Sequence, residues 1–313
     1  MSRIRASRAW VPVICLLVGA GLASVAWWLA TRKDRGEPTP GGQVAVSYDR
    51  GPHEAEQLLR RSGRFDHVAE TLNREVALPH DLDARIVSDR TAIQKGIGGP
   101  TYVPEDRTVY FPWAFVSQSH DDLVELSKHT AQFSHSEVDE VLANAMEFVL
   151  YHEFAHGMVD ELDVPVLAGQ ERTADSLATV FSLLSDEEGE ALPLSVAVLE
   201  LTRAQHGGTP SIADYADDHG FDRERAFDAI CSVYGSAPKE HRELLSGPHA
   251  LPSTRAELCP YDYNALVRDW RRTLAPYLTH SGTFLPPGFD PPPKPTDRER
   301  DDIADELKFQ PGD

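Results

Sequence analysis

Apolar residues recur at helical spacing in the middle of this 313-residue chain and lead to a pair of histidines. The repeating positions are Val138, Val141, Leu142, Ala145, Met146 and Val149. Because residues three and four apart share one face of a helix, the same stripe continues through His152, His156 and Val159. The pattern predicts a buried helix from Ser136 to Glu161 with two histidines on its apolar face.

Glu153 follows the first histidine, so the segment reads H-E-x-x-H. A spacing of four residues puts both imidazoles on one side of a helix, close enough to share a metal ion. In this pattern two neutral imidazoles hold zinc, and the glutamate is the general base on the zinc-bound water. The competing interpretation is a helix turn that happens to carry two histidines. The apolar stripe favours the interpretation as a metal site, because a bound metal removes the cost of burying two histidines and a glutamate.

A catalytic zinc needs a third protein ligand and one open position. The next predicted helix begins near Gly169, and its first turns carry Glu171 and Asp175 on one side. We expect Glu171 to complete the metal site and Asp175 to accept the outward N–H of a ligand histidine. Two alternatives stay open: Asp175 as the direct ligand, or an acidic first turn that only complements the helix dipole.

The stretch from His152 to Ala178 resembles the metallopeptidase-like family catalogued as DUF4344, and the resemblance extends from about Phe65 to Tyr277. That family is similar to the glutamate zincins, in which an H-E-x-x-H helix precedes an E-x-x-x-D helix. The resemblance implies a zinc peptidase-like site formed by His152, Glu153, His156 and Glu171, with Asp175 behind it. Later matching segments are Ala216 to His219, Arg225, Cys231 with Val233 to Ser236, and Leu251 to Ala256 with Cys259.

The remaining periodic segments predict an α+β fold that is mainly helical with a small β-sheet, because strands come early and helices late. The resemblance makes this fold zincin-like. Strands are predicted at 84–88 and 108–111, and further helices at 54–61, 65–76, 115–129, 192–206, 222–233 and 264–278. A strand ahead of the metal helix could present its edge to an extended peptide, or the sheet could simply cover the core.

Residues 1–8 are short and basic, and residues 9–30 form a run of 22 without charge. Such a run is long enough to cross a bilayer as a helix. We therefore expect a single-pass signal-anchor, with residues 1–8 in the cytoplasm and the catalytic domain outside it. The alternative is a cleavable signal peptide and a secreted protein, because residues 24–26 resemble a cleavage site.

Composition divides the rest of the chain into three parts. Residues 31–62 are predicted to be a flexible linker, residues 63–280 a metallopeptidase-like domain, and residues 281–313 a Pro-rich, acidic, disordered tail. The formal net charge is −20. An acidic chain argues against nucleic acid as a partner, since nucleic-acid binding requires a basic face.

Cys231 and Cys259 lie in the part of the chain that we place outside the cytoplasm. An oxidising compartment favours a disulfide between them over two buried thiols. Neither cysteine has the spacing of a zinc ligand pair.

The function predicted from the sequence is a membrane-anchored zinc metallopeptidase that acts on a peptide or protein. His219, Tyr234 and Arg255 are candidates for donating a hydrogen bond to the oxyanion, although each could equally be a structural residue. Two other functions remain open. One is a non-catalytic, metal-stabilised extracytoplasmic binding module, and the other is a zinc amidase that acts on a cell-wall peptide.

Overall fold

The computed structural model describes residues 41–129, 134–166, 169–185, 189–206, 222–247, 249–279 and Phe284. The chain divides into two units, Met1–Pro40 and Gly41–Asp313, and all the described residues belong to the second. The predicted anchor, residue His219 and all of the predicted tail except Phe284 lie outside the described residues. Within the described part, no helix combines the length and the apolar character needed to cross a membrane.

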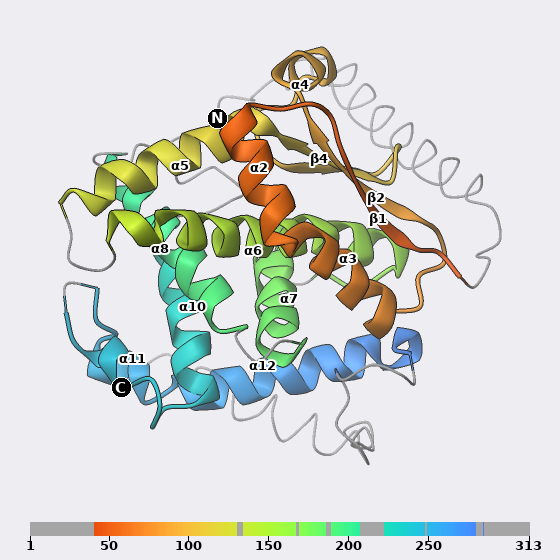
Figure 1. Cartoon of the computed structure of the whole chain (residues 1–313). Coiled ribbons are helices and arrows are strands. Elements are labelled where there is room, and N and C mark those ends of the chain that lie inside the picture. Colours follow the sequence, from red (N-terminus) through yellow and green to blue (C-terminus); the bar gives the residue numbers. More distant parts are fainter. Residues whose placement is uncertain are drawn as a thin grey trace, which may run out of the picture. The chain divides into compact units, whose positions relative to one another are not determined.

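A mixed four-stranded sheet is formed by the early part of the second unit (Figure 1). Its strands are β1 (Val44–Tyr48), β2 (Leu82–Val87), β3 (Thr101–Val103) and β4 (Thr108–Pro112), in the spatial order β1-β2-β4-β3. β1, β2 and β4 run parallel, with Val44 opposite Leu82. β3 is antiparallel to β4 and lies at one edge, with Tyr102 opposite Val109.

The sheet buries one face against helices because its apolar residues alternate along the strands. Leu82, Ala84 and Ile86 of β2 are buried in the main core, whereas Asp83 and Arg85 between them are exposed. This period of two is the normal consequence of strand geometry. The short helix α4 (Asp89–Lys95) packs with Tyr110 in a separate small cluster.

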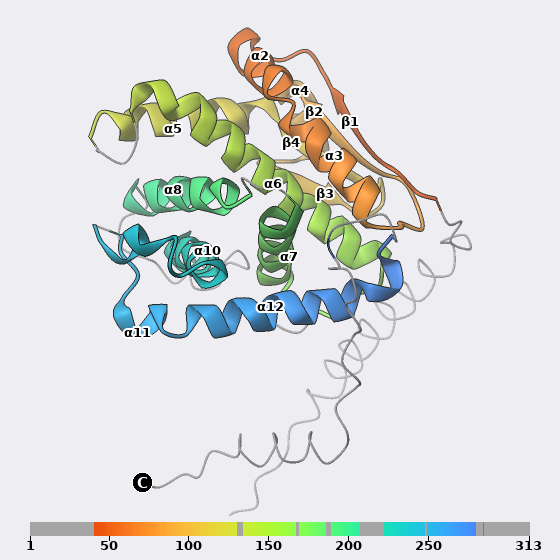
Figure 2. The same cartoon turned by 60° about the horizontal axis from the view of Figure 1, so that its bottom comes forward.

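The central element is α6 (Val138–Glu161), which carries the two histidines. Residues buried along its length contribute to one core together with the sheet and several other helices. The helices ahead of it are α2 (His53–Ser62), α3 (Arg64–Glu75) and α5 (Trp113–Ser127). Those after it are α7 (Gln170–Ser185), α8 (Ala191–His206), α10 (Asp222–Ser236), α11 (Ser253–Ala256) and α12 (Cys259–Leu274). Figure 2 shows α7, α8 and α10 lying between α6 and α12.

The sequence predicted the main elements, and the result is a mainly helical structure with a small mixed sheet, consistent with α+β. The predicted linker at residues 31–62 is wrong from Val44 onward. β1 pairs with β2, and α2 buries Leu59 completely. The glycines and prolines around β1 suggested a linker, but the short strand gains its partners from residues almost forty positions later, such as Leu82. β3 and α4 were not predicted.

Phe284 is a described residue of the predicted tail, and it belongs to the core. Its ring is 1% exposed and lies 4.8 Å from the ring of Phe181 on α7. Its backbone N–H donates to the buried carboxylate of Glu75 at 2.8 Å, and its carbonyl accepts from Arg271 at 2.8 Å. The predicted start of the tail at residue 281 is therefore too early, because Phe284 still belongs to the main core.

The predicted disulfide between Cys231 and Cys259 is confirmed. It joins α10 to the start of α12 and closes a loop with a sequence separation of 28. Both cysteines are buried in a second core cluster formed with residues of α8 and α11. The bridge therefore fixes two helices of the C-terminal half to each other.

We expect the double variant Cys231→Ser, Cys259→Ser to lose about 3–4 kcal/mol of unfolding free energy, because the open chain regains loop entropy. Urea denaturation without reductant measures this loss. Cys15→Ser is the matched control, because it removes a cysteine that the disulfide does not use. An unchanged free energy of unfolding in the double variant would contradict the prediction.

A candidate metal centre between two helices

The two histidines face α7 because of how that helix packs against α6. Ala174 and Ala178 are fully buried, and their small side chains allow close approach of the two helices. The ring of Tyr151 on α6 stacks on that of Phe181 on α7, with centroids 6.1 Å apart. This packing places the first turn of α7, which holds Glu171, opposite the histidine face of α6.

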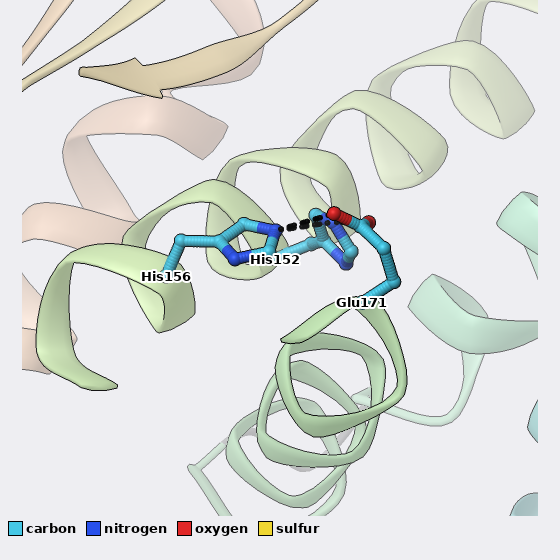
Figure 3. A group of neighbouring side chains, drawn as sticks. All are labelled: His152, His156 and Glu171. Carbon is cyan, nitrogen blue, oxygen red and sulfur yellow. Dashed lines mark hydrogen bonds and ion pairs between the residues drawn. The ribbon is translucent and has the colours of Figure 1, made fainter. Parts of the chain in front are cut away.

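His152, His156 and Glu171 converge on one point (Figure 3). The Nε2 atoms of the two histidines lie 3.2 Å apart. The Oε2 atom of Glu171 lies 3.2 Å from the Nε2 of His152, and its Oε1 lies 3.4 Å from the Nε2 of His156. The Glu171 carboxylate therefore points at the histidines, which argues against the alternative that Glu171 only complements the helix dipole.

These separations fit a tetrahedral metal site. Zinc bonds to imidazole nitrogen and carboxylate oxygen are about 2.0–2.1 Å long, so two ligand atoms of one tetrahedron lie roughly 3.3–3.4 Å apart. The two Nε2 atoms lie 3.2 Å apart, and each lies 3.2–3.4 Å from a different oxygen of Glu171. With one ligand atom taken from each residue, the three atoms lie within 4.8 Å of one another. Two imidazoles and one carboxylate are also a ligand set that catalytic zinc sites use. The residues present thus fit a cation of this size and preference.

Asp175 holds His152 from the side opposite Glu171. The Nδ1 of His152 donates to the Oδ1 of Asp175 at 2.8 Å, which leaves Nε2 free to bind a metal. Burial lowers the pKa of His152, but the hydrogen bonds to Asp175 and Glu171 outweigh it and raise that pKa to about 10. A metal that binds at neutral pH must therefore displace a proton from this cluster.

Asp175 itself is held by Arg225 of α10. The guanidinium donates from Nε to Oδ2 and from Nη2 to Oδ1, both at 2.8 Å. Burial raises the pKa of Asp175, but His152 and Arg225 lower it by more, so the net shift is downward. Asp175 is thus kept as a carboxylate, and its contact with His152 is the one expected from the sequence.

Glu153 is buried on the side of α6 that meets the sheet. Its Oε2 accepts the backbone N–H of Tyr102 in β3 at 2.9 Å. Burial raises the pKa of the Glu153 carboxyl, which makes it a better proton acceptor. The sheet approaches this closely because residue 157 is glycine. A Cβ there would lie 3.1 Å from the Tyr102 ring and 3.2 Å from Leu82.

A cleft of about 520 Å³ adjoins the cluster. It lies between β3, the C-terminal half of α6 and the start of α7, and its walls include Tyr102, Glu153, His156, Asp160 and Glu171. Two of the proposed ligands, His156 and Glu171, and the proposed base therefore border this cleft, whereas His152 lies buried behind them.

The two described candidates for the oxyanion donor lie elsewhere. Tyr234 packs on the second core cluster, beside the disulfide. Arg255 pairs with Asp262 at 2.5 Å and with Asp228 at 3.8 Å. Neither lines the cleft, and Arg255 borders a separate cavity instead. That prediction is therefore wrong for Tyr234 and Arg255, and His219 lies outside the described residues.

Comparison with protein families matches residues 47–274 to DUF4344, a family described as "putative metallopeptidase". The match spans well over half of the chain. The chain belongs to the DUF4344 family. Searches of curated proteins and of solved structures gave no match.

Membership in DUF4344 confirms the resemblance predicted from the sequence, and it suggests a metal-dependent peptidase. The matched range contains every residue of the cluster and the Asp175–Arg225 pair. Sequence reasoning missed two contributors, the Tyr102 N–H and the hydrogen-bonding role of Arg225. Arg225 had drawn attention only through the DUF4344 resemblance.

We expect Glu171→Ala to weaken zinc binding by more than about 100-fold, because loss of even an outer hydrogen-bonding partner costs 10–100-fold. Competition with a chelator of known zinc affinity measures the dissociation constant. Glu140→Ala is the control, because Glu140 is an exposed acid on the helix that carries the histidines. Equal zinc affinity in Glu171→Ala and the wild type would remove Glu171 from the ligand set.

Proposed function

We propose that this DUF4344 protein is a zinc-dependent metallopeptidase that hydrolyses peptide bonds. The observation that carries this proposal is the convergence of His152, His156 and Glu171, whose nitrogen and carboxylate oxygen atoms lie close enough to bind one metal ion. Glu153 lies beside this cluster on the same helix, and both border an open cleft. Zinc is the metal proposed, because imidazole with carboxylate suits it.

When bound, the metal would activate a water molecule and polarise the scissile carbonyl. His152 and His156 would hold it through their Nε2 atoms, and Glu171 through its carboxylate. Glu153 would accept the proton of the attacking water on its carboxylate and pass it to the leaving amine. Its burial supports this role, because a raised pKa brings the carboxyl closer to neutral pH. Asp175 would keep the Nδ1 proton on His152 throughout.

The edge strand β3 supports a peptide as the substrate. The N–H of Tyr102 points away from β4 and reaches Glu153, so this edge of the sheet borders the cleft. An extended peptide can add to such an edge through main-chain hydrogen bonds. That position would bring its carbonyl groups past Glu153 and the histidine pair.

We further propose that residues 9–30 anchor the protein in the membrane and that the peptidase domain lies outside the cytoplasm. The length and uncharged character of this run support the proposal. The disulfide supports the topology, because disulfides persist in oxidising compartments.

For catalysis, Glu153→Gln should retain zinc and lower kcat on an unfolded protein substrate by about 100-fold or more, because proton transfer contributes that much. The amide keeps the shape of the side chain but cannot take the proton. Zinc content and cleavage of denatured casein are measured on the same preparation, with Glu140→Gln as the control.

Full activity in Glu153→Gln would exclude Glu153 as the base. Zinc binding without cleavage of proteins by the wild type would favour the non-catalytic binding module instead. Release of amines from a cell-wall peptide, with casein left intact, would favour the amidase.

For the anchor, the double variant Leu17→Arg, Val18→Arg should leave the membrane fraction after carbonate extraction. Each arginine near the centre of a spanning helix costs about 2.5–3.5 kcal/mol of insertion free energy. Leu17→Val, which keeps the run apolar, is the control. Equal retention of the arginine variant and the control in the membrane would contradict a spanning segment at 9–30.

A further inference from the structure

The hydrogen bonds of Asp175 continue from the metal cluster to Arg225 of α10, which does not line the cleft. Asp175 uses Oδ1 for both His152 and Arg225, and Oδ2 for Arg225 alone. The two parallel bonds from one guanidinium fix the plane of the carboxylate. A carboxylate so fixed can meet the imidazole N–H of His152 in only one orientation.

Arg225 is itself restrained from a second side. Its Nη1 lies 3.8 Å from the Oε1 of Glu200 on α8, a side chain that is buried and also lies 3.7 Å from Arg203. The guanidinium therefore faces Asp175 with one edge and Glu200 with the other. Its position is set by α8 and α10 together.

The helix that carries Arg225 is in turn tied to α7 through α12. The disulfide joins α10 to α12, and the Trp270 indole of α12 donates to the Ser176 hydroxyl of α7 at 2.9 Å. Ser176 follows Asp175 in the chain. Two linked helices thus contact two consecutive residues of α7, next to the turn that carries Glu171.

Arg225 lies outside the cleft that holds Glu153, His156 and Glu171. It borders a different cavity of about 360 Å³, whose walls also include Asp175, Glu200 and the two cysteines. A substrate in the cleft would therefore not touch Arg225. Any effect of this residue on the metal centre must pass through Asp175.

We propose that Arg225 is a positioning residue, which sets the zinc affinity of the centre by fixing Asp175 against the Nδ1 proton of His152. The inference rests on the metal centre of the proposed function, but not on any hydrolytic activity. Without the guanidinium, the Asp175 carboxylate would be free to turn, and His152 would no longer be held with Nε2 toward the metal.

The test measures the zinc dissociation constant of the full chain by chelator competition. Arg225→Gln should weaken binding by about 10–100-fold, the range found for partners of metal ligands. Arg225→Lys should fall between Gln and wild type, because an ammonium keeps the charge but cannot form the two-pronged contact. Arg223→Gln, an equal loss of charge at an exposed position of α10, should bind zinc as the wild type does.

A double-mutant cycle with Asp175→Asn separates positioning from a general structural effect. If Arg225 acts through Asp175, then Arg225→Gln causes no further loss of affinity in the Asp175→Asn background. The same 10–100-fold loss in both backgrounds would overturn the proposal, and so would wild-type affinity in Arg225→Gln. Should Arg225→Gln not fold, the cycle is completed with Arg225→Lys. Failure of the wild type to bind zinc would instead remove the centre itself.

Discussion

The packing of α6 against α7 places polar groups where an ordinary helix pair would place apolar ones. Two imidazoles and a carboxylate meet in a partly buried space, and each of the three has a donor atom within 4.8 Å of the others. Such an arrangement is costly without a shared partner, because buried polar groups lose their hydration. A cation that all three side chains bind would offset this cost of burial, and its binding would then stabilise the folded domain. The arrangement of the neighbouring elements follows from this requirement.

Each neighbouring layer supplies one restraint on the cluster. The sheet contributes the Tyr102 N–H to Glu153, and Gly157 allows the close approach that this contact needs. The C-terminal helices contribute Arg225 to Asp175 and thereby fix His152. The side toward the cleft is left open. The fold thus holds these groups on the side of the sheet and the C-terminal helices, and the cleft lies on another side.

The local part of the site could be predicted from the sequence, and the long-range part could not. The convergence of His152, His156 and Glu171 could be predicted from helix periodicity and one short chain reversal, because these residues are close together in the sequence. Tyr102 reaches Glu153 across 51 positions, and Arg225 reaches Asp175 across 50. No periodicity links such pairs. The DUF4344 resemblance located Arg225 but did not say what it contacts.

The same reasoning explains the errors. β1 lies among glycine and proline residues, which suggested a linker although Val44, Val46 and Tyr48 favour a strand, and its partner β2 is almost forty positions away. Tyr234 and Arg255 were chosen for their chemistry alone. Tyr234 lies on α10 and Arg255 on α11, and neither lines the cleft. Arg255 instead borders the separate cavity that Asp175 and Arg225 also line.

X-ray absorption at the zinc edge of the metal-loaded full chain tests the central claim most directly. The account predicts a first shell of nitrogen and oxygen at about 2.0–2.1 Å, with the scattering pattern of two imidazoles and a total of four ligands. A shell that contains sulfur at about 2.3 Å, or one that contains no imidazole, would place the metal elsewhere and contradict the account.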